Sequence, residues 1–299
     1  MDGADAFSEL RVVTTAAWLA DDLRAGTHLP VVHDLGLDVL PGRRRTAWWA
    51  GHRFIARLTV TPDVQLPDLT SPGPAWLAGV DADLLGRRVW CGPLGDVEEC
   101  SLWDAGPAFA KPAEIKRVAL PAALHPTREA FAAAALGAGL LASSWVVVSE
   151  PIDLTAEYRC FVAPVEGRPR VVAASAYVVD GITWDAWTPP FVPDVAVPWA
   201  FAEEVLDSTS GPAGWVLDVG RTADGQWVVV EANAAWSSAP YHADAVGVVA
   251  SVLASQTPPV EPRWRWRSDP ALDRWAAPLP VRRPAAVAGL SGLPHMGGL

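Results

Sequence analysis

The sequence predicts an α+β protein with two or three subdomains, on the strength of two patterns and the composition. Residues 216–219 and 227–233 are β-branched runs on either side of residues 222–225, which have the composition of a hairpin turn. Upstream, a helix-like run opens at Pro126 and is followed by a strand-like run over residues 145–148. With 299 residues, 51% of them hydrophobic, the chain can bury a sizeable core.

Composition divides the chain into three expected parts. Strand-like and helix-like pieces alternate before residue 106, which predicts a small α/β domain over residues 1–106. Residues 107–257 hold the runs described above and form the expected main domain. Residues 258–299 form a tail rich in Pro, Arg and Trp, which we expect to pack on the body or to fray at its end. Stacking of its Trp and Arg side chains on nucleic-acid bases is the weaker alternative.

An uncharged stretch over residues 130–149 approaches the length of a membrane span. Arg128 and Glu129 suit the first turn of a helix, and the end of the stretch resembles a strand. A buried helix followed by a buried strand accounts for the whole stretch, so we expect no membrane partner.

The remaining composition excludes some classes of protein. A net charge of −11 argues against a broad nucleic-acid-binding surface. Cys91, Cys100 and Cys160 lack metal-like spacing and are expected to be small buried thiols in a reducing compartment. The first five residues lack the basic and apolar regions of a signal peptide, so a cytoplasmic protein is expected.

The expected hairpin carries an unusual polar set. Glu231 and Asn233 lie two positions apart on one strand and therefore share a face, and the hairpin brings Asp218 towards them. Two carboxylates and an amide oxygen form a hard set of ligands that suits Mg²⁺ and its nucleotide phosphates better than zinc. The alternative is a polar strand end that faces solvent.

The distribution of lysine is a second signal. Of the 23 lysines and arginines only two are lysines, Lys111 and Lys116, and they lie five residues apart. Arginine has replaced lysine elsewhere, so these two positions suggest a need for the compact ammonium group, which binds phosphate as a point charge. Chance placement of two surface lysines is the alternative.

Five short motifs then occur in order between residues 107 and 255 and resemble the ATP-grasp superfamily. The resemblance is strongest to its small bacterial and phage-associated branch, which has a compact Lys-Pro…Lys element. It implies an ATP-grasp fold, in which two α+β subdomains grip ATP, preceded here by the small α/β domain. The motifs are Lys111-Pro112 with Lys116, Val147-Val148-Ser149-Glu150-Pro151-Ile152, Glu157-Tyr158-Arg159, Asp218, and Glu231-x-Asn233.

The resemblance also implies roles for these residues. The two lysines would hold the phosphates or the adenine edge of ATP, and the end of the strand over residues 145–148 would line the adenine pocket with backbone groups. One or two Mg²⁺ ions would lie on Asp218, Glu231 and Asn233. The implied nucleotide-binding residues are Lys111, Lys116, Val148, Glu150, Ile152 and Glu157.

Two arginines are the catalytic candidates. Arg159 is implied to contact the γ-phosphate, where its planar fork suits anionic oxygens. An ordinary exposed sheet residue is the alternative for Arg159. Arg221 is a weaker candidate on the acceptor side. Residues 85–89 also resemble a segment of this branch, without an assignable role.

Together these roles imply an ATP-dependent carboxylate–amine ligase acting on an amino acid, peptide or similar small acid. A carboxylate is a poor acylating agent because its leaving group would be oxide, and conversion to an acyl phosphate removes that obstacle. The alternative is a nucleotide-binding interaction or regulatory protein without ligase chemistry. The sequence identifies neither the acid and amine nor the oligomeric state.

Overall fold

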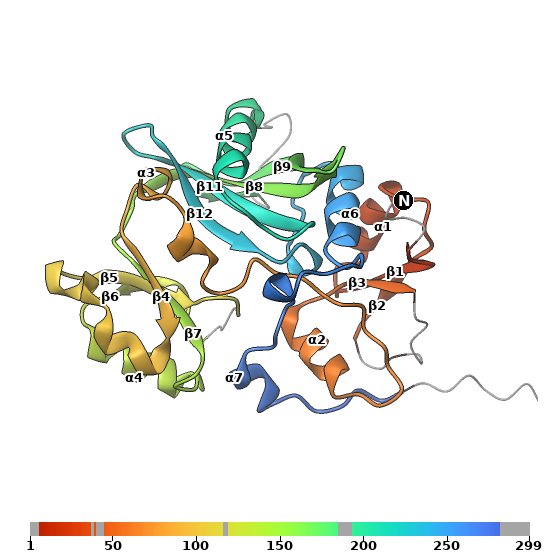
Figure 1. Cartoon of the computed structure of the whole chain (residues 1–299), viewed down its shortest axis with the longest axis horizontal. Coiled ribbons are helices and arrows are strands. Elements are labelled where there is room, and N and C mark those ends of the chain that lie inside the picture. The colour runs from red at the N-terminus through yellow and green to blue at the C-terminus, as the bar shows by residue number, and fades with distance from the viewer. Residues whose placement is uncertain (1–5, 37–38, 40–44, 116–118, 185–192, 282–299) are drawn as a thin grey trace, which may run out of the picture.

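The computed structural model describes residues 6–36, 39, 45–115, 119–184 and 193–281. Helices and three β-sheets are mixed along this part of the chain, which confirms the expected α+β class (Figure 1). No described helix is both long and apolar enough to cross a membrane. Short 3-10 turns connect several elements: η2 (Trp76–Gly79), η3 (Leu94–Glu99), η4 (Ser101–Ala105), η6 (Ala235–Ser237) and η7 (Pro262–Trp264).

The N-terminal part contains a three-stranded parallel sheet in the order β2-β1-β3. Leu10, Arg11 and Val12, successive residues of the central strand, are all buried, as expected for a parallel strand covered on both faces. The expected alternation of strands and helices is present here. Its elements are β1 (Glu9–Val13), α1 (Ala17–Ala25), β2 (Val31–Asp34), β3 (Thr46–Trp49) and α2 (His52–Thr59).

A second, antiparallel sheet has the order β4-β7-β5-β6 and carries α4 on one face. The expected domain boundary at residue 107 would separate β4 from β7 and β5, with which it forms one sheet, so we propose a boundary N-terminal to β4. The elements of this unit are α3 (Ala82–Leu85), β4 (Val89–Pro93), β5 (Ala108–Pro112), β6 (Ala123–His125), α4 (Arg128–Gly137) and β7 (Trp145–Ser149).

The helix and strand expected within residues 126–149 are confirmed as α4 and β7. The Thr127 hydroxyl accepts a hydrogen bond from the Ala130 amide and caps the helix, with Glu129 in the first turn. The helix ends before Gly139, whose positive φ of 85° turns the chain towards β7.

The third sheet is antiparallel, in the order β10-β9-β8-β11-β12, and separates two hydrophobic cores. Helix α5 packs on the face that holds Leu217 and Val219, whereas α6 packs on the opposite face at β8 and β9. The elements are β8 (Leu154–Val165), β9 (Arg168–Val179), β10 (Ile182–Thr183), α5 (Ala196–Ser208), β11 (Trp215–Thr222), β12 (Trp227–Asn233) and α6 (Ala245–Ala254).

Asp244 caps the N-terminus of helix α6. The Asp244 carboxylate accepts hydrogen bonds from the amides of Val246 and Gly247. At Gly247 a Cβ atom would lie 2.1 Å from the carbonyl oxygen of Val172, so only glycine allows this close packing of α6 on β9.

The described part of the C-terminal tail packs on the body, as expected. Leu279 is buried and Trp266 partly buried in the core of the N-terminal domain, and Val281 forms a β-bridge with Val39. The short helix α7 (Pro270–Asp273) lies in this segment (Figure 1). Cys100 and Cys160 are buried free thiols, whereas Cys91 is partly exposed.

Candidate active site

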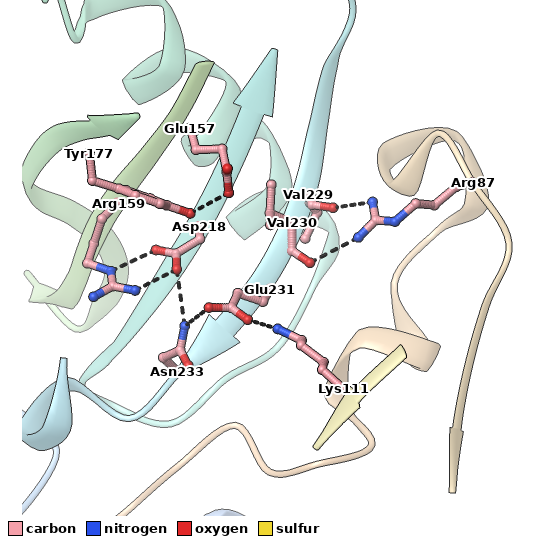
Figure 2. A network of polar contacts seen from close by, with 10 residues as sticks. All are labelled: Arg87, Lys111, Glu157, Arg159, Tyr177, Asp218, Val229, Val230, Glu231 and Asn233. Atoms are coloured by element: carbon pink, nitrogen blue, oxygen red, sulfur yellow. Dashed lines mark hydrogen bonds and ion pairs between the residues drawn. The ribbon is translucent and has the colours of Figure 1, made fainter. Parts of the chain in front are cut away.

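A row of polar side chains crosses the five-stranded sheet. Arg159 of β8 lies opposite Ser175 of β9 and Asp218 of β11. Asp218 in turn lies opposite Glu231 of β12. Residues directly opposite on neighbouring strands share a face, and Asn233 joins them two positions after Glu231. The expectation that the hairpin unites Asp218 with Glu231 and Asn233 is confirmed (Figure 2).

Arg159 and Asp218 form a bidentate ion pair in the interior. Arg159 donates from Nε to Oδ1 at 2.9 Å and from Nη2 to Oδ2 at 2.7 Å, and the two side chains are 4% and 0% exposed. Burial opposes the charge on Arg159, but the charge and hydrogen bonds of Asp218 more than offset it, so the pKa of Arg159 is raised. Arg159 is thus a permanent cation and not the exposed sheet residue of the alternative interpretation.

A second ion pair joins the two antiparallel sheets. Lys111 of β5 donates to Oε2 of Glu231, and both side chains are about one-fifth exposed. Asn233 connects this pair to the first, because its Nδ2 donates to Oε1 of Glu231 at 2.9 Å and to Oδ2 of Asp218 at 3.1 Å. Two cations, two carboxylates and one amide therefore form one continuous network (Figure 2).

Glu157 lies on the same face as Arg159, two positions earlier on β8, and accepts a hydrogen bond of 2.7 Å from the Tyr177 hydroxyl. Burial raises the pKa of Glu157, and the charge of Asp218 adds to this effect. The Tyr177 bond and the nearby cations oppose it. Burial also raises the pKa of Tyr177 well above its usual range, so its hydroxyl remains a donor.

Two aromatic rings cover Arg159. Its guanidinium carbon lies 5.5 Å from the centre of the Tyr177 ring and 5.1 Å from that of Tyr241, and the two rings stack on each other. Tyr241 has a φ of 53°, a left-handed conformation that costs a non-glycine residue on the order of 1 kcal/mol or more. The fold holds this strained conformation directly over the buried cation.

Arg87 is a site residue to which sequence reasoning gave no role. Its guanidinium donates to the carbonyl oxygens of Val229 and Val230, at 2.8 and 3.0 Å. The strand register shifts here, and Val230 is the extra residue of a β-bulge just before Glu231. Arg87 therefore fixes the backbone that presents Glu231 (Figure 2). The resemblance of residues 85–89 to a family segment was the signal that pointed to it.

The structure does not bring Arg221 into this network. Along β11, Asp218 and Gly220 alternate with Val219 and Arg221, so Arg221 points to the opposite face. It lies on the same side of the sheet as Tyr158. Burial raises the pKa of Tyr158, and the charge of Arg221 lowers it by a smaller amount. Arg221 therefore lies on the face opposite to the network, and its catalytic role stays a prediction.

The residues expected around adenine differ in their accessibility. Val148 is fully buried, and its strand is paired on both sides by β4 and β5, so its backbone groups belong to the sheet. Glu150 accepts hydrogen bonds from the Arg88 amide and Nε, both at 2.8 Å, and Arg88 lowers the pKa of Glu150. Ile152 lies near Gly86 at the end of α3. Lys116 lies outside the described residues.

Two cavities adjoin the network. A small one, of about 20 Å³, lies between the two sheets beside Lys111, Val147 and Glu231. A larger cleft, of about 810 Å³, is lined by Arg159 and Asn233 and extends to α2 and α7. The network therefore has one side between the sheets and another facing a large cleft.

Among the described residues, no group of three or more His, Cys, Asp and Glu side chains is arranged to hold a metal. The chemistry of the donors nevertheless fits Mg²⁺, because Asp218, Glu231 and Asn233 offer only hard oxygen ligands and Mg²⁺ completes its shell with water and phosphate.

A sequence profile of the ATP-grasp domain, R-2-K clade family 2, matches residues 84–251. The match confirms the superfamily that the motifs resemble and the expected ATP-grasp fold. The small bacterial and phage-associated branch and its Lys-Pro…Lys element stay predictions. A comparison with curated proteins found no match.

Solved structures include similar chains. A RimK domain ATP-grasp protein from Sphaerobacter thermophilus is 15% identical, with a TM-score of 0.43, over 83% of this chain and 99% of that one. The ATP-grasp ligase PsnB, complexed with a minimal precursor, is 16% identical, with a TM-score of 0.45, over 84% and 99%. The N5-carboxyaminoimidazole synthetase from Staphylococcus aureus, complexed with ADP, is 8% identical, with a TM-score of 0.40, over 86% and 80%.

Proposed function

Since this chain is a member of family 2 of the R-2-K clade of ATP-grasp domains, we propose that it is a carboxylate–amine ligase that works through an acyl phosphate. Membership of the superfamily makes it an ATP-dependent ligase. The proposal adds the reaction type, the residues and the metal. Its substrates are a small-molecule or peptide carboxylate and an amine.

The observation that carries the proposal is the continuous network of Lys111, Glu231, Asn233, Asp218 and Arg159. Phosphoryl transfer depends mainly on positioned cations and carboxylate-bound metal around the γ-phosphate. The network supplies the cations Lys111 and Arg159 and two carboxylates that could hold a metal. Its members come from two sheets, as expected for a site that closes around a nucleotide.

The partners of the carboxylates suggest how ATP is accommodated. Without nucleotide, Lys111 neutralises Glu231 and Arg159 neutralises Asp218. The phosphates of ATP would compete for Lys111, and Mg²⁺ held by Glu231, Asn233 and Asp218 would neutralise Glu231 in its place, while Arg159 keeps its ion pair with Asp218. When bound, the metal would stabilise the charge that develops on the phosphates.

The reaction requires two displacements. A carboxylate oxygen of the acid attacks the γ-phosphorus, the bond to the bridging oxygen breaks, and ADP leaves. The amine then attacks the acyl carbon, phosphate leaves, and the amine loses a proton. Arg159 lines the large cleft and is permanently charged, so it is placed to stabilise both the transferring phosphoryl group and the departing phosphate.

The experiment is to incubate the protein with MgATP and panels of acids and amines and to measure phosphate release. Hydroxylamine, added in place of the amine, should convert an acyl phosphate to a hydroxamate that can be detected by mass. The Glu231→Gln variant is the control, since it keeps the shape of the side chain and removes its charge. Tight ATP binding without phosphate release for any acid and amine pair would support a nucleotide-binding interaction protein instead.

A further inference from the structure

The large cleft offers room for a second ligand beside the nucleotide site. Its volume of about 810 Å³ lies within the range of roughly 300 to 1,000 Å³ typical of small-molecule sites. Arg159 and Asn233 line it, whereas Lys111 and Glu231 line the small cavity between the sheets. A ligand in the cleft would therefore meet the network from the side opposite to the sheet that carries Lys111.

The charged residues of the cleft favour an anion. Arg53 and Arg57, from α2, and Arg159 supply positive charge, and Glu114 is the acidic residue of the lining. Burial raises the pKa of Glu114, and the hydrogen bond donated by the Ser71 hydroxyl opposes this shift. A carboxylate is therefore a better occupant than a simple ammonium ion.

The other wall of the cleft is apolar. It consists of Ala271 and Leu272 of α7, followed by Trp275 and Ala276. Trp275 is 63% exposed, which is high for the largest apolar side chain. An apolar ligand that covered this wall would remove apolar surface from water, which is favourable. A strongly polar ligand in the same place would lose its hydration and find no hydrogen-bond partner on the wall, which is unfavourable.

The apolar wall is held firmly in place. The segment over residues 269–279 contacts the part of the chain that holds the four-stranded sheet, because the Ser144 hydroxyl donates a hydrogen bond of 3.0 Å to the Asp269 carboxylate. It is tied to α2 by Arg57 Nε, which donates to the Ala277 carbonyl oxygen at 2.9 Å. These residues lie beyond the family match, which ends at residue 251.

We propose that this cleft binds the acid substrate and selects a carboxylic acid with an apolar body, such as a branched aliphatic or aromatic amino acid. The carboxylate faces Arg159, and the apolar body lies against Leu272 and Trp275. The C-terminal segment thereby determines acceptor specificity. The inference rests on the ligase function proposed above.

Selectivity is tested in solution by calorimetric titration of the full chain, saturated with magnesium and a non-hydrolysable ATP analogue. The probes are L-leucine, L-phenylalanine, glycine and L-aspartate, which share the α-carboxylate and differ in the side chain. Leucine or phenylalanine is expected to bind about tenfold tighter than glycine or aspartate, or more. Equal affinities, tighter binding of aspartate, or no binding of the apolar amino acids would overturn the proposal.

Matched variants test whether the wall carries the selectivity. Leu272→Asp is expected to weaken leucine and phenylalanine binding about tenfold while changing the affinity for the ATP analogue less than twofold. Leu136→Asp is the control, because Leu136 is 57% exposed on α4 outside the cleft lining. Trp275→Ala is expected to weaken leucine and phenylalanine binding to a similar extent as Leu272→Asp. Trp275→Phe keeps an aromatic side chain and is expected to bind both amino acids more tightly than Trp275→Ala. Equal effects of the Leu272 and Leu136 variants would contradict the role of the wall.

Phosphate release, measured with the same four amino acids and an amine, separates this inference from the ligase proposal. Selective binding of apolar amino acids without phosphate release would retain the inference about the cleft and remove the ligase function. Phosphate release with glycine or aspartate alone would retain the ligase function and overturn the inference.

Discussion

The two ion pairs of the site differ in where they lie and in what they connect. The inner pair, Arg159 with Asp218, joins neighbouring strands of one sheet and is shielded from water. The outer pair, Lys111 with Glu231, joins one sheet to another and is about one-fifth exposed. Similar charges therefore experience very different surroundings within one network.

This difference in exposure indicates which ion pair can be opened when another charged group binds. Opening the inner pair would leave a charge uncompensated in the interior, which is strongly unfavourable. Water and anions can reach the exposed fifth of the outer pair, so replacing one of its partners costs less free energy. We infer that the inner pair is a fixed part of the sheet and that the outer pair is the contact that nucleotide phosphates replace. Four predictions test this division, from the largest expected effect to the smallest.

Removing the acid of the inner pair should have the largest effect on stability. Asp218→Asn leaves Arg159 charged and buried without its counter-ion, and the free energy of unfolding should fall by about 3 to 5 kcal/mol. Urea denaturation followed by tryptophan fluorescence measures this loss. Glu231→Gln is the matched control and should lose less free energy of unfolding, because water can reach the outer pair. Equal losses in the two variants would show that the pairs do not differ in the way proposed.

Removing the acid of the outer pair should instead affect turnover. Glu231→Gln should lower the rate of phosphate release by roughly two to three orders of magnitude, because the carboxylate is needed most as charge develops in the transition state. MgATP affinity should change far less. In a double variant with Asp218→Asn, the loss of turnover should be smaller than the two separate losses combined, since both residues act on the same metal. Turnover of Glu231→Gln near wild type would remove the metal assignment.

The cation of the outer pair should affect nucleotide affinity more than stability. Lys111→Ala removes a charge-assisted bond to phosphate, which corresponds to about 1.5 to 3 kcal/mol of MgATP binding free energy. Lys116→Ala is expected to have a similar effect. Calorimetric titration gives the affinities, and thermal unfolding checks that each variant is folded. Wild-type affinity in the double lysine variant would exclude both residues from the nucleotide site.

The smallest effect concerns Glu157, whose pKa burial raises. A carboxyl group with a raised pKa in the folded state stabilises the protein most at low pH, and this contribution is lost as the pH rises past its unfolded pKa and then its folded pKa. Glu157→Gln keeps an acceptor for Tyr177 and does not titrate. Between about pH 4 and pH 7 the variant should therefore gain stability relative to the wild type. Urea midpoints at several pH values measure the difference, and a difference that is constant with pH would contradict it.

The site shows how far the sequence alone can be taken. Alternation along the β12 strand placed Glu231 and Asn233 on one face, and the turn composition paired that strand with the one carrying Asp218. These are local properties, because a strand repeats every two residues and a hairpin fixes its own register. The scarcity of lysine also indicated Lys111, since the use of lysine in place of arginine can be read from the sequence without any structure.

Contacts between distant segments could not be inferred in this way. The role of Arg87 depends on the β12 bulge, which is defined by how the strands pair. The distance between Arg221 and the polar network depends on which face of the sheet its side chain occupies. The boundary expected at residue 107 divides a sheet because composition does not record which strands pair.

By itself the sequence determined the α+β class, the ATP-grasp resemblance and the set of polar residues, because each follows from short motifs and local periodicity. The folded structure was needed to show that Arg159 is shielded from water and paired with Asp218, that Glu231 meets Lys111 across two sheets, and that residues 269–279 wall the large cleft. The physical reason is that burial and charge pairing depend on which surfaces meet after folding. Those surfaces come from segments far apart in the chain, such as those of Arg57 and Ala277, which are separated by 220 residues.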